Sequence, residues 1–225
     1  MACRADAGGT LRSRKRVTPL RILALSGSLR QESFNTQLLR ALPSVAPDNM
    51  EFDIFAGLGD LPHYNQDLDV EDAPEPVQRL RTAITAADGF LIATPEYNNS
   101  IPGVVKNAID WASRPVSSSA LLGKSVCVMV ATPGRNLGRN CMADLSRVLH
   151  ECHAHVISGP NLIVNEAGTR LQNVKDEATG EITTTFVDPF VQRVAAAQLH
   201  SLAEAIEHDA GRHAATPLRA FLTPR

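Results

Sequence analysis

The sequence predicts an α/β protein built on one parallel sheet, and two patterns carry that prediction. Near-continuous apolar runs, typical of strands buried on both faces, recur along the chain. Segments with apolar residues at helical spacing separate these runs from residue 20 onward. Five such units in roughly 145 residues fit a flavodoxin-like, doubly wound, five-stranded parallel sheet of order 2-1-3-4-5, with helices on both faces.

Each element is predicted by a local signal. The strands are the apolar runs at residues 20–26, 50–55, 89–94, 125–131 and 155–157. The helices are expected at residues 33–42, 74–87, 102–112, 137–149 and 189–209. Pro74 and Pro102 suit a first helical turn, where the missing N–H would have no partner anyway. Residues 161–185 are less regular, and a turn signal at 176–181 predicts a hairpin there.

The length of 225 residues suits one domain, which we place at residues 19–210. Residues 1–18 are basic and lack periodic apolar residues, so we expect a disordered basic tail. An Arg-rich organellar presequence is the alternative for this segment, because it has no secretory h-region. Residues 211–225 are expected to form a C-terminal tail.

The composition excludes several classes of protein. A net charge of −2 gives no electrostatic case for binding nucleic acid. No apolar run approaches the roughly 20 residues that span a bilayer. The four cysteines show no CxxC spacing, which favours free thiols in a reducing, cytoplasmic compartment. His150, His153 and His155 span a helix end and a strand start, so no metal site is expected.

The loop at residues 27–36 joins the first strand to the first helix and carries the groups of a phosphate site. A helix N-terminus presents unpaired N–H groups and a partial positive charge. Arg30 can neutralise a phosphate, and the side chains that can donate to its oxygens are Ser28, Ser33, Asn35 and Thr36. The loop has neither a Walker A nor a GxGxxG pattern, and it suits a terminal monophosphate such as that of FMN. The alternative is that Ser33 only caps the helix and Arg30 is solvated.

The loop after the third strand suits a flat heterocycle. Tyr97, Asn98 and Asn99 offer an aromatic ring and two carboxamides at the carboxyl end of a strand, where open α/β sheets bind ligands. A flavin ring is such a ligand. A well-capped helix, with Ser100 as its cap, is the alternative, and it leaves the Tyr-Asn-Asn run unexplained. The single tryptophan, Trp111, is expected in the core or at a subunit interface.

The loop after the fourth strand, residues 132–139, is expected beside the previous one. Its N–H groups could stabilise negative charge on the pyrimidine side of a reduced flavin.

Two motifs together resemble the NADPH-dependent FMN reductase family, which includes the bacterial quinone and chromate reductases. They are Gly-Ser-Leu-Arg-x-x-Ser-x-Asn at 27–35 and Thr-Pro-Glu-Tyr-Asn-x-Ser-x-Pro-Gly-x-x-Lys-Asn-Ala-Ile-Asp-Trp at 94–111. Residues 61–67 are also similar to the family's loop after its second strand, and the resemblance covers about residues 20–205.

The resemblance implies bound FMN, hydride supply from NADPH or NADH, and a homodimer or homotetramer. By position, the phosphate would be held by Ser28, Arg30, Ser33, Asn35 and Thr36. The ring would be bordered by Pro95, Glu96, Tyr97, Asn98 and Asn99, and its pyrimidine end approached by Thr132 and Gly134. One position departs from the family pattern, because Leu137 stands where the first glycine of a pair is usual.

The predicted function is therefore that of an FMN-dependent NAD(P)H oxidoreductase. Electrons would pass from NAD(P)H through FMN to quinones, flavins, azo compounds or oxidised metal ions such as chromate. No catalytic side chain is predicted, because the chemistry is carried by the flavin. The first alternative is an FMN-binding electron carrier without nicotinamide oxidase activity, and the second is a phosphate-binding module without redox function.

Overall fold

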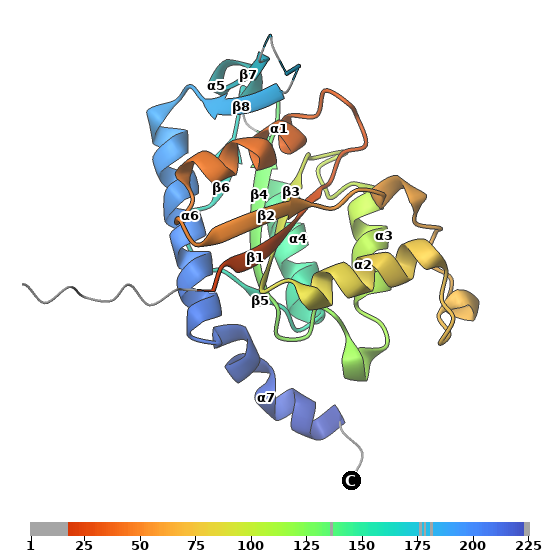
Figure 1. The fold of residues 1–225 in the computed structure, drawn as a ribbon. Coiled ribbons are helices and arrows are strands. Elements are labelled where there is room, and N and C mark those ends of the chain that lie inside the picture. Colours follow the sequence, from red (N-terminus) through yellow and green to blue (C-terminus); the bar gives the residue numbers. More distant parts are fainter. Residues whose placement is uncertain (1–17, 136, 176, 178, 181, 223–225) are drawn as a thin grey trace, which may run out of the picture.

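A computed structural model describes residues 18–222 except 136, 176, 178 and 181. Its main sheet is parallel, with the order β2-β1-β3-β4-β5, as predicted (Figure 1). These strands are β1 (Leu20–Ser26), β2 (Met50–Ile54), β3 (Gly89–Thr94), β4 (Ser125–Ala131) and β5 (His155–Val156). A sixth strand, β6 (Leu162–Val164), pairs with the second half of β4 and was not predicted.

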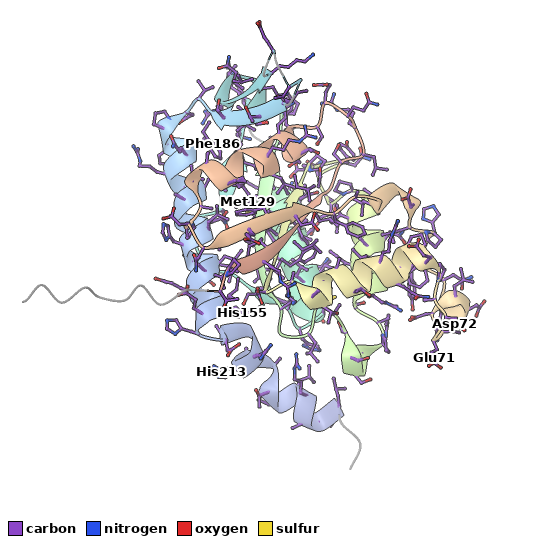
Figure 2. All side chains as sticks on the ribbon, in the orientation of Figure 1. Glu71, Asp72, Met129, His155, Phe186 and His213 are labelled. Carbon is purple, nitrogen blue, oxygen red and sulfur yellow. The ribbon has the colours of Figure 1, made fainter. Side chains whose placement is uncertain are left out.

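Helices cover both faces of this sheet, which confirms the doubly wound arrangement. One face packs against α2 (Glu75–Ala86), α3 (Gly103–Ala112) and α4 (Arg139–Glu151). The other packs against α1 (Phe34–Ala41) and α6 (Pro189–Glu207). Along each strand, alternate side chains point into the two hydrophobic cores, which lie on opposite faces of the sheet. In β4, for example, Val128 faces the first core and Met129, which Figure 2 labels at the centre of the molecule, faces the second.

Shorter elements complete the chain. The 3₁₀ helices are η1 (Leu42–Val45), η2 (Leu58–Asp60), η3 (Gln66–Leu68) and η4 (Val116–Ser118), and α5 (Ala167–Arg170) is a single turn. The predicted hairpin is confirmed as β7 (Leu171–Lys175) paired antiparallel with β8 (Ile182–Phe186). Among the described residues, no helix is both long enough and apolar enough to cross a bilayer.

The C-terminal segment differs from its prediction. Residues 211–225 were expected as a tail, but Ala210–Leu222 forms helix α7. This helix contains Gly211 and Pro217, and both residue types usually indicate the end of a helix. For this reason no helix was predicted here. The predicted basic tail lies almost wholly outside the described residues.

Trp111 is a core residue. It is fully buried, its ring meets that of Tyr64 edge-on at 4.9 Å, and its indole N–H donates to the Pro62 carbonyl at 2.8 Å. Asn107, one turn earlier on α3, donates to the same carbonyl at 2.9 Å and accepts from the Tyr64 N–H at 2.8 Å. Helix α3 thereby holds the loop at residues 61–67 against the sheet.

Candidate functional site

A cavity of about 570 Å³ lies where β1, β3 and β4 end, at the carboxyl edge of the sheet. Its size is typical of a cofactor site. It is lined by Ser28, Arg30, Glu32, Ser33, Phe34, Asn35, Gln37, Pro95, Tyr97, Ala131 and Pro133. The structure therefore brings together six of the predicted site residues, which are Ser28, Arg30, Ser33, Asn35, Pro95 and Tyr97. The other five lining residues were not predicted, because nothing in their local pattern marks them; they are Glu32, Phe34, Gln37, Ala131 and Pro133.

The first loop is folded for an anion. The Ser33 hydroxyl caps α1 by accepting from the N–H groups of Asn35 at 3.2 Å and Thr36 at 3.4 Å. The first turn of α1 has no acidic side chain, so the positive end of the helix is not neutralised there. The Arg30 guanidinium donates to the Glu32 carbonyl at 2.7 Å, and the Ser28 hydroxyl accepts from the Arg30 N–H at 3.4 Å. This loop fits the phosphate of FMN.

Two residues that were expected to bind phosphate also stabilise the loop. The Asn35 side chain is buried and forms a double hydrogen bond with the backbone of Ala131 at the end of β4, at 3.0 and 2.8 Å. The Thr36 and Ser26 hydroxyls are 2.7 Å apart and share a hydrogen bond. Both side chains thus tie α1 to the sheet, and their contact with a phosphate stays a prediction.

Gly27 allows the first two loops to approach each other, a role the sequence motif did not reveal. A Cβ atom at this position would lie 2.7 Å from Thr94 Oγ1 and 2.7 Å from Val105 Cγ2. The Gly27 N–H donates to the Ala93 carbonyl at 2.7 Å. Any larger residue would push the phosphate loop away from the end of β3.

The Asn98–Asn99 pair has a backbone explanation. Tyr97 and Ser100 exchange two backbone hydrogen bonds of 3.0 Å, which close a two-residue turn. Both asparagines have positive φ, 52° and 61°, the left-handed conformation that asparagine tolerates better than most residues. Neither asparagine lines the cavity, whereas Tyr97 lines it with 52% of its surface exposed. The contact of both carboxamides with a flavin ring stays a prediction, and the backbone turn is a second explanation for the pair.

Glu96 points to helix α4, not into the cavity. One oxygen of its carboxylate accepts from the N–H groups of Gly138 at 3.0 Å, Asn140 at 3.1 Å and Cys141 at 3.1 Å. The next contact along this loop goes to the same helix, because the Ser100 hydroxyl donates to Asp144 at 2.6 Å. Glu96 was expected to border the ring and Ser100 to cap α3, and both instead join the second loop to α4.

The third loop is stabilised by its own contacts and by the turn after β6. The Thr132 hydroxyl accepts from the Gly134 N–H at 3.3 Å, and the Gly134 carbonyl accepts from the Glu166 N–H at 3.1 Å. Thr132 is buried, and neither it nor Gly134 lines the cavity. Their expected place at the pyrimidine end of a flavin stays a prediction.

Leu137, the departure from the family pattern, packs over Gly134. A Cβ atom on Gly134 would lie 2.8 Å from Leu137 Cδ1. The following Gly138 has a φ of 105°, and a Cβ there would lie 2.8 Å from Val130 and 2.9 Å from Ile163. The second glycine of the pair is thus required by packing, while the first position accommodates a half-exposed leucine.

No cysteine among the described residues has the lowered pKa that a nucleophilic thiolate requires. Burial raises the pKa of Cys127 to about 12, and burial with the nearby Glu96 and Asp144 carboxylates raises that of Cys141 to about 12. These two cysteines and Cys152 are free. Within the described part of the chain, no three His, Cys, Asp or Glu residues are grouped as a metal ion requires.

Comparisons with known proteins agree with this geometry. The sequence profile of the NADPH-dependent FMN reductase family matches residues 20–169. A 2-hydroxy-1,4-benzoquinone reductase from a Burkholderia species is 38% identical over 174 residues, which are 76% of this chain and 94% of that protein. A quinone reductase from Escherichia coli is 39% identical over 164 residues, covering 72% and 85% of the two chains.

A solved structure has the same fold. The flavoenzyme NAD(P)H:(acceptor) oxidoreductase FerB from Paracoccus denitrificans superposes with a TM-score of 0.72 at 34% identity. The alignment covers 84% of this chain and 98% of that one.

Proposed function

Because the chain belongs to the NADPH-dependent FMN reductase family, we propose that it oxidises NAD(P)H on bound FMN and reduces a small quinone. The protein is an FMN-dependent NAD(P)H oxidoreductase. The observation that carries the proposal is the cavity in which the loop that carries Arg30 and ends at the N-cap of α1 meets the loop that carries Tyr97. Quinones are favoured among acceptors because two similar relatives are named for quinone reduction.

FMN, when bound, supplies a ring that accepts a hydride from NAD(P)H and returns the electrons to an acceptor. The residues of this chain bind and orient. Arg30 and the hydroxyl groups of Ser28 and Ser33 would hold the phosphate. Pro95 and Tyr97 would border the ring, and the backbone of Thr132–Gly134 would approach its pyrimidine end.

The phosphate assignment is tested by comparing FMN with riboflavin, which lacks the phosphate. Replacing Arg30 with alanine should weaken FMN binding about tenfold or more, because a charge-assisted contact is lost. Riboflavin affinity should not change. Arg40→Ala is the matched control, because Arg40 is exposed in the last turn of α1, the helix that follows this loop. An equal loss for both flavins, or for neither, would show that Arg30 does not hold the phosphate.

Steady-state kinetics test the activity. Protein loaded with FMN should be yellow and should consume NADPH or NADH when benzoquinone is present. A protein that binds FMN but does not oxidise either nicotinamide would be an electron carrier. A protein that stays colourless after FMN is added would contradict the whole proposal.

We also propose that the enzyme works as a homodimer or homotetramer in the cytoplasm. The family resemblance supports the first part, and the three free thiols of the described residues are consistent with a reducing compartment. Sedimentation equilibrium would give the assembly, and a single species with the mass of one chain would contradict it.

A further inference from the structure

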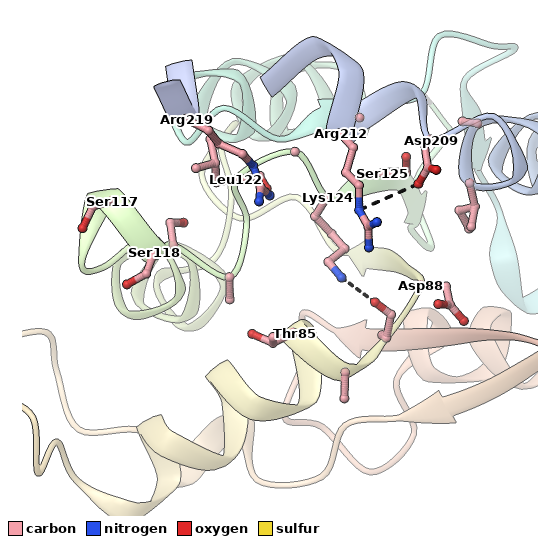
Figure 3. A pocket seen from close by; sticks show the side chains of 18 residues that line it. Thr85, Asp88, Ser117, Ser118, Leu122, Lys124, Ser125, Asp209, Arg212 and Arg219 are labelled. Atoms are coloured by element: carbon pink, nitrogen blue, oxygen red, sulfur yellow. Dashed lines mark hydrogen bonds and ion pairs between the residues drawn. The ribbon is translucent and has the colours of Figure 1, made fainter. Parts of the chain in front are cut away.

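A second cavity, of about 640 Å³, lies at the opposite edge of the sheet, where β3 and β4 begin (Figure 3). Its walls come from the turn between α2 and β3, from η4 and the turn before β4, and from the start of α7. The flavin cavity lies at the other ends of the same strands. The two cavities therefore share no lining residue.

Three cationic side chains line this second cavity. Lys124 comes from the turn before β4, and Arg212 and Arg219 come from α7 (Figure 3). Two carboxylates, Asp88 and Asp209, also line it, so the lining has one more positive than negative charge. Guanidinium groups match the geometry of phosphate and carboxylate anions.

The contacts of Lys124 and Arg212 leave donors for a ligand. The Lys124 ammonium donates to the Ala87 carbonyl. Asp88 accepts from the backbone N–H of Arg21 at 2.8 Å. Arg212 pairs with Asp209 at 3.8 Å between Nε and Oδ1, which is beyond hydrogen-bond length, so its N–H groups are not used up by that carboxylate.

Close packing of two glycines holds helix α7, which carries both arginines, against the turn before β4. Gly123 has a φ of 72°, and a Cβ atom on it would lie 2.9 Å from the Ala215 Cβ and 2.9 Å from the Gly211 carbonyl. A Cβ on Gly211 would collide with the Gly123 carbonyl. Arg219, two turns further along α7, donates to the Leu122 carbonyl at 2.8 Å. Helix α7 thus docks on the residues next to Lys124.

The electrostatics of Lys124 show that the cations repel one another. Burial lowers its pKa from 10.5 to about 8; Asp88 opposes this shift, and Arg212 and Arg219 add to it. A bound anion would relieve that repulsion. Both arginines lie beyond residues 20–169, which the family profile matches, whereas Lys124 and Asp88 lie within that segment.

We propose that this second cavity binds a small phosphorylated anion between Lys124, Arg212 and Arg219. The three cations come from the turn before β4 and from α7 and line one cavity, which suits a phosphate with oxygens in several directions better than a planar carboxylate. The site is separate from the flavin site, so it does not depend on the proposed redox function.

Calorimetric titration of the FMN-saturated protein with pyrophosphate tests this proposal, because FMN then occupies the other phosphate site. We expect one site, with Arg212→Gln weakening binding about tenfold through loss of a charge-assisted contact. Arg212 is the preferred position because it is exposed and its one ion pair is long. Arg193→Gln, which removes an exposed arginine from α6, is the matched control and should bind as the unmodified protein does.

Three results would overturn the proposal. The first is no binding of pyrophosphate at millimolar concentration. The second is equal affinity in the Arg212→Gln and Arg193→Gln proteins. The third is binding of citrate as tight as that of pyrophosphate, which would show that the site does not select phosphate. Circular dichroism of each variant would establish that α7 and the rest of the fold are retained.

Discussion

At the scale of single residues, the Glu96 carboxylate joins the cavity-lining loop that carries Pro95 and Tyr97 to the start of helix α4. It leaves β3 next to cavity-lining Pro95 and Tyr97 and accepts three N–H groups at the start of α4. Those N–H groups have no partner within the helix, and the negative charge is favourable at a helix N-terminus. One side chain thus caps a helix and anchors a binding loop.

Glu96→Gln should therefore lower both stability and flavin affinity. The amide keeps an acceptor but loses the charge, so the free energy of unfolding should fall by about 1 kcal/mol. Urea unfolding of the apoprotein and FMN titration measure the two effects. Glu75→Gln is the control, because Glu75 lies in the first turn of α2 and pairs only with exposed Arg79. Equal effects of the two substitutions would show that Glu96 has no special role.

Lys124 should make stability depend on alkaline pH. Its pKa is about 8 in the fold, and burial is the main cause of this lowering. The positive charges of Arg212 and Arg219 lower the pKa further, while the negative charge of Asp88 raises it. Asp209 lines the same cavity. The unfolded chain keeps this lysine protonated up to about pH 10.4, so between these values the unfolded state binds more protons and rising pH favours the fold.

Lys124→Met removes this titration. Between about pH 7.5 and pH 9.5, the unfolding free energy of the unmodified protein should rise relative to that of the variant by about 1 kcal/mol, after allowance for solvent screening. Urea unfolding of both proteins at several pH values measures the difference. A difference that is constant with pH would mean that Lys124 titrates in the fold as it does in the unfolded chain.

At the scale of elements, two explanations exist for Asn98 and Asn99 in the turn between Tyr97 and Ser100: the backbone needs positive φ there, or the carboxamides contact the cofactor. If they are present because both positions need positive φ, glycine should replace Asn99 without loss. Asn99→Gly should then keep FMN affinity, while Asn99→Ala should cost about 1 kcal/mol of stability, since alanine disfavours the left-handed region. Flavin titration and urea unfolding of both variants give the answer. Weaker FMN binding in Asn99→Gly would instead indicate that the carboxamide contacts the cofactor.

The elements also show what sequence can and cannot predict here. The strands β1, β3 and β4 were predicted with their observed ends, because each is a buried apolar run bounded by proline, glycine or polar residues. Strand β6 is three residues long and α7 contains Gly211 and Pro217, so neither has a sufficient local pattern. The directions of Asn35 and Glu96 depend on Ala131 and on α4, which are distant in sequence. Residue type marked these positions, but only the fold shows their partners.

At the scale of the whole molecule, strand β4 is the element that joins the two cavities. Its amino end follows Lys124 at the second cavity, and its last residue, Ala131, lines the flavin cavity. All seven of its residues are buried, and it pairs with β3 along six residue positions. A strand that is buried and paired along its length has one arrangement in the fold. Coupling between two sites requires an element with two discrete arrangements, so we infer that β4 does not couple the two cavities.

FMN and pyrophosphate should therefore stabilise the fold additively. Each ligand that binds only the folded state raises the unfolding free energy by about 2.7 kcal/mol at a hundred times its dissociation constant. Independent sites require the two increments to sum, whereas coupled sites give a total that differs by the coupling free energy. Urea unfolding with neither, either and both ligands forms the necessary cycle, and Arg212→Gln should remove only the pyrophosphate increment. A combined effect clearly above or below the sum would mean that the sheet transmits binding from one edge to the other.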